Sequence, residues 1–468
     1  MRLDLHGYYR VRFLELHNIL EDGEDTGLFS DVDSARFFVQ RLRLEPALTY
    51  GPNPQSPIGA LRIQVDALDD VVFGDNSGLA SVPLFAGDPS TVDRRSSDVP
   101  SILLKRAWLE VMLPLGLLRV GRMPSQWGMG LLTSDGNGFD DDFGDNVRGS
   151  TFDRILFATR PVAIGRVLTG REPGSFPLLL AVAYDLLVEI PLDDDSHRSP
   201  YGNWLAEGAD DVRQWTFVAF YNDTAPNPLR VSDEIKAGVY FVNRKQPSTE
   251  SNAFIGDAYV RLRWGMFFAE AEGLHIWGST RAIPFPPPDP GELADQKDAD
   301  IWGGVARAGV ETPLFGVRLE AGYASGDAVR EDEDFTGRPL HPDFNVGLLL
   351  YEEVLAEKTA QTWGTGARGF WSLGGVYDSY YLSLTGKVRP LPGLELIALA
   401  LLAMPDQVDT VIESDDPLGV ETDLAAKIDF ARYFRFALEA GLLFPMDGLG
   451  TVGTGLPWTV QSRLAMAF

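Results

Sequence analysis

Polar and apolar residues alternate along the first segment of the chain. In residues 2–13 the even-numbered positions are mostly polar and include Arg10 and Arg12, whereas the odd-numbered positions are mostly apolar and include Leu5 and Val11. Because neighbouring side chains of a β-strand point to opposite faces, a period of two places these groups on opposite sides of one strand. The segment therefore predicts a strand with one polar and one apolar face.

The same alternation returns throughout the chain. Further examples are residues 58–73, 253–264, 316–326, 376–389 and 417–429. These segments exceed the roughly 5–6 residues of an ordinary strand and reach the about 9–11 residues with which a tilted strand crosses a membrane. Repetition and length together favour a transmembrane β-barrel over a soluble sandwich. The polar faces should line a water-filled interior along the whole length of each strand.

The connections alternate between short and long, which is typical of barrels with short periplasmic turns and long extracellular loops. The short connections are residues 51–57, 114–116, 264–265, 313–316, 390–393 and 430–433. The long ones are residues 17–33, 74–100, 133–151, 188–211, 280–301, 327–370, 404–416 and 445–457. We predict an all-β fold, a transmembrane antiparallel up-and-down β-barrel of about 18 strands (16–18) that forms a single domain over residues 1–468. The turn within residues 161–176 cannot be placed from the pattern.

The longest loop, residues 327–370, contains the best helix candidate of the chain, residues 346–359. Loops of this length without a function are uncommon in compact domains. We therefore expect this loop to fold over or into the pore and to narrow or cover the channel.

Composition and charge exclude several other classes of protein. The formal net charge of −27 argues against nucleic acid as a partner. The absence of cysteine excludes disulfide scaffolds, thiolate metal sites and cysteine nucleophiles. No run of 18 apolar residues is present, so the chain is not a helical membrane protein. The acidic runs, such as residues 193–195 and 331–334, fall in predicted loops, which makes the extracellular loops acidic.

The two ends of the chain fit an exported barrel. Met1 is followed directly by the first strand pattern, so we expect a mature chain from which an export signal has been removed. The last segment, residues 458–468, is amphipathic and ends in Phe468. It resembles the signal by which the barrel-assembly machinery recognises its clients. That resemblance implies the outer membrane of a Gram-negative bacterium, with the assembly machinery, membrane lipid and lipopolysaccharide as partners.

A second resemblance lies in residues 106–130, RAWLEVMLPLGLLRVGRMPSQWGMG, where a short Gly turn is followed by Gly121-Arg122 and later by Trp127 and Gly128. This hairpin looks like that of large single-chain porins and of the alginate-export family of barrels. The segment ETDLAAKIDF, residues 421–430, is also similar. The resemblance implies an outer-membrane channel.

The residues that could carry chemistry are few. The five histidines are scattered without metal-ligand spacing, and no nucleophile elbow or Walker loop is present. We therefore expect no enzymatic activity and no cofactor. One set of loop carboxylates could bind Ca²⁺ or Mg²⁺ weakly through oxygen ligands, although solvated loop charge explains it equally well. This set is Asp140, Asp141, Asp142 and Asp145.

Arginines on the predicted inner face are the strongest functional feature. They are Arg10, Arg12, Arg41, Arg43, Arg62, Arg106, Arg119, Arg122, Arg261, Arg263 and Arg318. One interpretation is that they form ladders with inner carboxylates and merely keep the wall polar. The other is that they select anionic solutes, because rings of Arg or Lys favour anions in pores. Strand lengths place five of them at a similar height, which predicts an anion-favouring constriction of Arg10, Arg12, Arg41, Arg43 and Arg106.

Two functions remain open from the sequence. The first is a porin-like channel for passive passage of small, possibly anionic, solutes. The second is an export barrel for an acidic polysaccharide that works with periplasmic partners, as the alginate-export resemblance implies. An exporter should be plugged at rest, for example by residues 327–370, whereas a porin conducts continuously. A third and weaker interpretation is a structural or adhesion barrel whose acidic loops are the active part.

Overall fold

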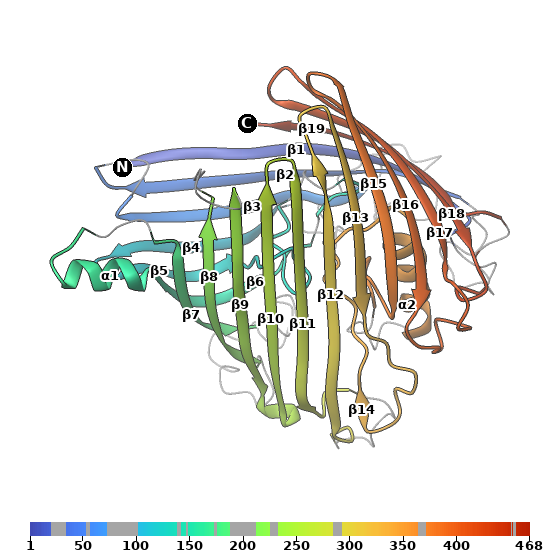
Figure 1. The fold of residues 1–468 in the computed structure, drawn as a ribbon, viewed down its shortest axis with the longest axis horizontal. Helices are drawn as coiled ribbons and strands as arrows, with labels where there is room; N and C mark the ends of the chain where they lie inside the picture. Colours follow the sequence, from blue (N-terminus) through green and yellow to red (C-terminus); the bar gives the residue numbers. More distant parts are fainter. Residues whose placement is uncertain are drawn as a thin grey trace, which may run out of the picture.

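The alternating segments form one closed β-sheet in the computed structural model (Figure 1). The structure describes residues 1–19, 34–52, 57–72, 102–137, 142–146, 148–172, 176–187, 212–224, 233–283, 293–363, 371–450, 452 and 455–468. Among these residues the sheet has nineteen strands, eighteen of them long. This confirms the predicted fold class and strand number.

The wall strands follow one another around the barrel in sequence order. They are β1 (Arg2–His17), β2 (Ser34–Tyr50), β3 (Gly59–Val72), β4 (Ile102–Leu113), β5 (Gly116–Pro124), β6 (Thr151–Thr159), β7 (Leu178–Leu186), β8 (Arg213–Asp223), β9 (Glu234–Gln246), β10 (Ser251–Trp264), β11 (Phe267–Thr280), β12 (Lys297–Glu311), β13 (Phe315–Ala324), β15 (Ser379–Leu391), β16 (Leu394–Pro405), β17 (Gly419–Phe430), β18 (Phe434–Pro445) and β19 (Trp458–Ala467). Each pairs antiparallel with the next, and β1 pairs with β19 to close the sheet. The two-residue strand β14 (Asp334–Phe335) lies in the connection between β13 and β15 and pairs in parallel with β12.

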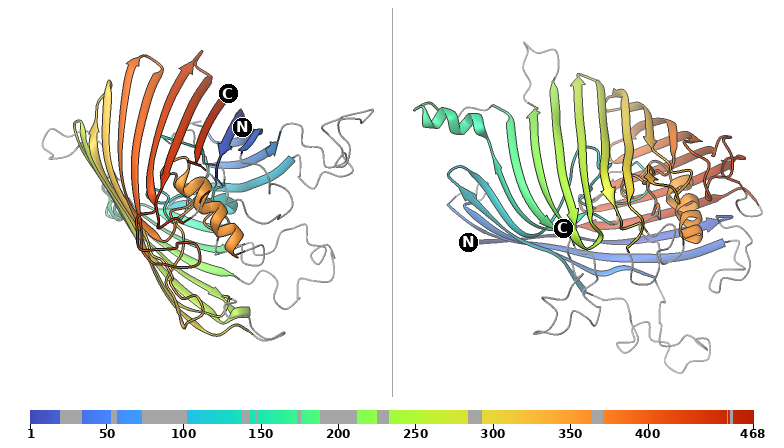
Figure 2. Two further views of the ribbon diagram at one scale, coloured as in Figure 1. Left: turned by 90° about the vertical axis from the view of Figure 1, so that its right-hand side faces the viewer. Right: turned by 90° about the horizontal axis from the view of Figure 1, so that it is seen from below.

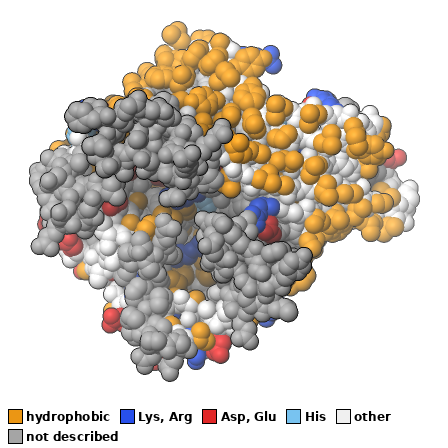
Figure 3. Space-filling view, turned by 180° about the vertical axis from the view of Figure 1, so that it is seen from behind, with side chains coloured by type: hydrophobic (Ala, Val, Ile, Leu, Met, Phe, Trp, Pro, Cys, Tyr) orange, Lys and Arg blue, Asp and Glu red, His pale blue; other side chains and the backbone are white. Residues whose placement is uncertain are grey.

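The two faces of the wall match the alternation of the sequence. On β15, Leu382 and Leu384 are about half exposed on the outer face, while the intervening Ser383 and its neighbour Thr385 are almost completely buried inside. Leu424 on β17 is 63% exposed on the outer face. In Figure 3 such apolar side chains cover a broad area of the outer wall. An outer face of this kind is what the hydrocarbon core of a membrane requires.

Short and long connections lie at opposite ends of the barrel, called here the turn end and the loop end. The turn between β10 and β11 and that between β17 and β18 are at the turn end, as predicted. One connection at this end is longer, because residues 161–176 contain helix α1 (Pro161–Leu168), which stands outside the wall (Figure 2). At the loop end, β9 and β10 are joined tightly through the 3₁₀ helix Pro247–Thr249.

The other helices lie inside the barrel. The π-helix Leu350–Leu355 runs directly into α2 (Ala356–Trp363), so the helical segment begins four residues later than the predicted 346–359 and extends beyond it. Figure 2 shows α2 on the inner side of the wall formed by β15–β18. Within the described part of the chain, no helix is both long and apolar enough to cross a membrane.

Two connections fold into the barrel: residues 125–150 between β5 and β6, and residues 325–378 between β13 and β15. They bring an apolar core into the interior, in which Leu348, Leu349 and Leu355 are at most 1% exposed. Inner positions of the wall that pack against this core are apolar, most clearly on β16, where Ile397, Leu399 and Leu401 face inward. The expectation of a polar inner face along every strand is therefore wrong on β16, because the wall there packs against folded-in chain rather than water.

We expect Leu424→Arg to lower the free energy of unfolding of the barrel in lipid by about 2–4 kcal/mol, because the new charge would face hydrocarbon. Leu424→Phe is the matched control and should leave stability nearly unchanged. Reversible unfolding in lipid vesicles measures both. Equal stability of the Arg and Phe variants would contradict the assigned outer face.

Candidate functional site

A short acidic segment of the 125–150 loop occupies the middle of the barrel. The Asp145 carboxylate contacts three guanidinium groups of the wall. Arg10 lies 2.7 Å away and Arg12 4.0 Å away on β1, and Arg463 on β19 is in direct contact. Arg463 also donates to the carbonyl oxygen of Gly144 at 2.7 Å. The side chain of Asp145 is 0% exposed, so this carboxylate is fully enclosed by cationic groups.

Three residues earlier, Asp142 makes the equivalent contact with another part of the wall. Its carboxylate pairs with Arg318 on β13 at 2.8 Å and with Lys387 on β15. Burial pushes the pKa of Asp142 upward, but the positive charges of Arg318 and Lys387 outweigh it and hold the pKa below its ordinary value. Asp142 is therefore ionised at neutral pH. Between the two acids, Phe143 is buried in the interior core.

The acidic segment Asp142–Asp145 lies between two cavities. The loop-end cavity, of about 380 Å³, is lined by Asp145, Arg148, Glu352 and Glu353 among others. The turn-end cavity, of about 580 Å³, is lined by Asp142 and by wall residues that include Lys387. One end of the segment thus faces each cavity. The segment is therefore the candidate constriction between the two cavities.

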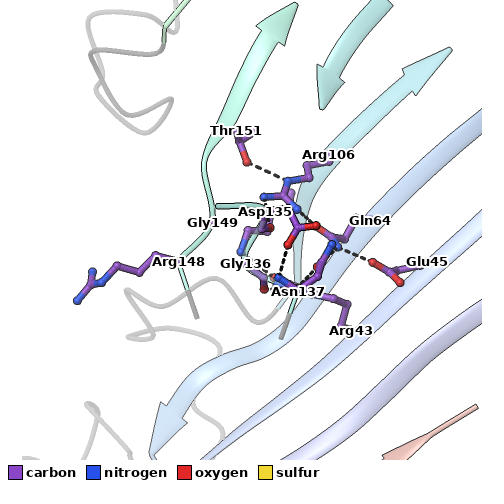
Figure 4. Close-up of polar contacts among 12 residues, drawn as sticks. Arg43, Glu45, Gln64, Arg106, Asp135, Gly136, Asn137, Arg148, Gly149 and Thr151 are labelled. Atoms are coloured by element: carbon purple, nitrogen blue, oxygen red, sulfur yellow. Dashed lines mark hydrogen bonds and ion pairs between the residues drawn. The ribbon is translucent and has the colours of Figure 1, made fainter. Parts of the chain in front are cut away.

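A second cationic group beside the constriction holds the 125–150 loop to strands β2–β4 (Figure 4). Arg43 pairs with both oxygens of Asp66 at 2.6 and 2.7 Å and also donates to the Asn137 side chain at 2.7 Å. Arg106 donates to four oxygens, of Thr151, Gln64, Asp135 and Ser150, at 2.8–3.3 Å.

All four acceptors of Arg106 are neutral, since Thr151 and Gln64 bind it through side-chain oxygens and the other two bind it through backbone carbonyls. Its positive charge is therefore not cancelled by a carboxylate in contact among the described residues. A β-bulge opposite Gln64 turns Lys105 inward as well, 3.4 Å from Asp66.

The two folded-in loops are joined to each other. The Asp343 carboxylate accepts hydrogen bonds from the backbone N–H groups of Arg148 and Gly149 at 3.0 and 2.7 Å. The backbone N–H of His341 donates to the carbonyl of Leu131 at 2.8 Å. These contacts fix the backbone of Arg148, whose own guanidinium points away from the cluster in Figure 4. No hydrogen bond or ion pair of that guanidinium is formed with the described residues, and it is exposed to the loop-end cavity.

The 325–378 loop is anchored to the neighbouring wall by Glu421 of β17. Its carboxylate accepts three backbone N–H bonds, from Leu348 at 2.7 Å, Leu349 at 2.8 Å and Leu350 at 2.8 Å. Asp423 accepts a further one from Leu348 at 3.2 Å. These N–H groups precede or begin the helical segment and have no partner within a helix, so a buried carboxylate is a strong partner for them. That the loop limits the current remains a prediction.

The structure places ten of the eleven predicted arginines on the inner face. Arg62 and Arg119 share Glu110, and Arg261 pairs with Glu270. The other inner arginines are Arg10, Arg12, Arg41, Arg43, Arg106, Arg263 and Arg318. Most of the predicted ladder with wall carboxylates is thus present. Whether these residues select solutes is not decided by their position.

Arg122 is the exception and needs a correction. It lies on the outer face beside the exposed Val120 and pairs with Asp153 of β6 at 2.7 and 2.8 Å. Arg119 and Arg122 are three positions apart in the sequence, so a regular strand cannot turn both side chains inward. Arg122 therefore does not line the pore.

The predicted open constriction of five arginines also takes a different form. Arg10, Arg41, Arg43 and Arg106 are at most 1% exposed, and the 125–150 loop contacts Arg10, Arg43 and Arg106 directly. Arg10 and Arg41 are direct cross-strand neighbours, as the expected common height requires. These arginines therefore cluster as predicted, but the cluster is buried and does not line an open passage.

Of the predicted divalent-cation ligands, Asp140 and Asp141 lie outside the described residues. Asp142 and Asp145 have Arg and Lys partners, as described above. Among the described residues no group of three or more His, Asp or Glu side chains is placed to hold a metal ion. A divalent-cation site at these loops remains an untested prediction.

Several site residues escaped the sequence analysis. Arg148 and Asp343 lie in loops, where no periodicity marks a direction. The alternation does place Asp257 of β10 and Glu272 of β11 on the inner face, but it does not show that they hold the 125–150 loop through Trp127 Nε1, at 2.8 Å, and the N–H of Met129. The sequence did carry one sign of chain folded into the barrel. The inner face of β16 is apolar, which departs from the alternation and indicates that other residues of the protein pack against it.

Solved structures match this geometry over its whole length, although no family model and no curated protein sequence matches the chain. OccAB1 of Acinetobacter baumannii matches with a TM-score of 0.55 at 10% identity, over 100% of this chain and 96% of that chain. A BenF-like porin from Pseudomonas fluorescens Pf-5 gives 0.53 at 10%, over 100% and 98%. OpdK of Pseudomonas aeruginosa with vanillate gives 0.50 at 10%, over 99% and 98%. The chain has the fold of these porins. At such identities the likeness establishes the fold alone.

Glu421→Gln should loosen the docking of the 325–378 loop, because an amide offers one acceptor oxygen in place of two and no charge. Charge-assisted hydrogen bonds contribute about 1.5–3 kcal/mol each, so amide exchange in residues 348–355 should accelerate by at least tenfold. Glu395→Gln, on the same wall near the turn end, is the control. Unchanged exchange in 348–355 would show that the apolar contacts alone hold the loop.

Ion selectivity should depend on pH through the loop-end cavity. Burial raises the pKa of Glu353 to about 7, with Arg12 opposing the shift. Glu353 is thus negative above pH 7 and neutral below it, and the cavity loses a negative charge as the pH falls. The anion-to-cation permeability ratio should therefore rise between pH 8 and pH 6 in reversal-potential measurements. Glu353→Gln should remove most of this dependence, and the control Glu395→Gln, near the turn end, should retain it; the reverse pattern would refute the assignment.

Proposed function

We propose that the chain is an outer-membrane channel for passive diffusion of small solutes, with a preference for anions. The fold supports a channel, because barrels of this size enclose an aqueous interior. The short turns at one end and long connections at the other match a barrel with its turn end in the periplasm and its loop end outside the cell. In this role the chain carries out no reaction, and the apolar outer wall contacts membrane lipid. The barrel-assembly machinery and lipopolysaccharide remain predicted partners.

The observation that carries the anion preference is the position of Arg106. It is a buried guanidinium beside the constriction, and its contacts are all neutral oxygens. Arginine stays charged in any environment, so this site contributes a positive potential that the wall pairs do not cancel. Arg148 adds a second cation in the loop-end cavity, and no carboxylate of the described residues contacts its guanidinium. The structure of OpdK with vanillate, a small organic anion, is consistent with such a solute class.

The polysaccharide exporter is not supported to the same degree. A polymer would have to pass two folded-in loops that leave cavities of only about 380 and 580 Å³, so both loops would have to leave the barrel. The solved structures compared above are porins and do not favour export either. The role of the 325–378 loop as a resting plug is consistent with either function.

The purified chain in a planar bilayer with a KCl gradient should give a reversal potential whose sign shows that chloride passes more readily than potassium. Vesicles that contain it should admit benzoate faster than benzamide, which has the same shape without the charge. Arg148→Gln should shift the reversal potential toward cations, whereas Arg432→Gln, at a turn away from the pore, should not. A wild-type chain that conducts no ions would reject the channel, and cation preference would reject the proposed selectivity.

A further inference from the structure

The environment of Asp145 is that of a bound organic carboxylate. Its carboxylate is held by Arg10, Arg12 and Arg463 and has no exposure to solvent. Guanidinium groups recognise carboxylates through paired, planar hydrogen bonds, whether the carboxylate belongs to a side chain or to a free solute. Three guanidiniums around one carboxylate are thus also a binding site for a permeating anion.

The segment that delivers Asp145 also closes the passage. Asp142 and Asp145 occupy two separate cation groups, on β13/β15 and on β1/β19, and each acid lines a different cavity. A solute anion that moves from the loop-end cavity to the turn-end cavity meets first the group that holds Asp145 and then the group that holds Asp142. Both groups are occupied by the chain's own carboxylates.

We propose that Asp145 is a built-in competitor that occupies the carboxylate site of the channel, and that a permeating carboxylate displaces it. This inference rests on the proposed anion channel and adds its regulation. Arg10, Arg12 and Arg463 keep a carboxylate partner throughout the exchange, so none of these three buried cations is left uncompensated. The displaced Asp145 enters the loop-end cavity, which it already lines.

Arg148 supplies the first step of this exchange. Its backbone is fixed by Asp343, its guanidinium is exposed in the loop-end cavity, and it lies three residues after Asp145. It can therefore hold an incoming anion beside the occupied site. After the exchange, the same guanidinium lines the cavity that receives the displaced Asp145.

The test uses the full chain in a planar bilayer and measures the benzoate concentration that halves the chloride current. Asp145→Asn removes the competitor's charge and keeps its shape, so the half-blocking concentration should fall about tenfold, since a charge-assisted contact is released for the solute. The control is Asp185→Asn, which removes an equally buried carboxylate that pairs with Arg154 within the wall at 2.6 Å. It should leave the half-blocking concentration unchanged. Benzamide should not respond to either variant.

A disulfide tests the same idea without removing a charge. The chain has no cysteine, and a Cβ at Gly144 would lie 3.5 Å from the side-chain nitrogen of Asn345. A disulfide between Gly144→Cys and Asn345→Cys should lock the segment, abolish benzoate block when oxidised and restore it on reduction. Because Gly144 has a φ of +68°, Gly144→Ala controls for backbone strain.

The outcomes separate this inference from the proposed function. A chain that conducts anions and whose benzoate block is insensitive to Asp145→Asn overturns the competitor and leaves the channel standing. Benzoate block that persists in the oxidised double-cysteine variant also overturns it, even if Asp145→Asn fails to fold. Failure of the wild-type chain to conduct ions overturns the proposed function itself.

Discussion

The hydrocarbon interior of a membrane offers no partner to a backbone N–H or C=O group, and this constraint governs the whole molecule. Each wall strand satisfies its backbone through two neighbours, and the pairing of β1 with β19 removes the last free edge. Once the sheet is closed, its inner face can be used for other purposes. The alternation of the sequence follows directly from this arrangement, because one face of each strand meets lipid and the other meets the interior.

Inside the wall a different balance applies. Charged residues there are enclosed by protein, so almost all of them are paired, as Arg43 is with Asp66 and Arg154 is with Asp185. The contacts of the loops follow the same rule, since the loop residues Asp145 and Asp343 and the wall residue Glu421 each place a carboxylate against N–H donors. The interior is therefore a network of ionic and hydrogen-bonded contacts around an apolar core, and the loop-end and turn-end cavities lie beside the described parts of the loops.

The sequence alone was sufficient for the barrel, its strand number and the direction of ten of the eleven arginines, because a period of two determines which face a residue takes. The prediction was wrong at Arg122, because its odd spacing from Arg119 places the two side chains on opposite faces of the strand. The course of the 125–150 loop could not be predicted, because residues such as Asp145 and Arg148 have no periodic neighbours that indicate a direction. For the 125–150 loop the sequence offered only an indirect sign, the inner Ile397 and Leu399 of β16, which break the alternation.

The position of Asp145 relative to the chain ends has a consequence for assembly. Arg10 belongs to the first strand and Arg463 to the last, so this one carboxylate spans the seam at which the sheet closes. Its ion pairs cannot be complete until strands separated by nearly the entire chain have met. The 325–378 loop, in contrast, docks on strands that neighbour it in sequence and can pack on an open sheet. The last internal contact to form is thus the one at the centre of the passage, and a barrel with an open seam has no ordered constriction.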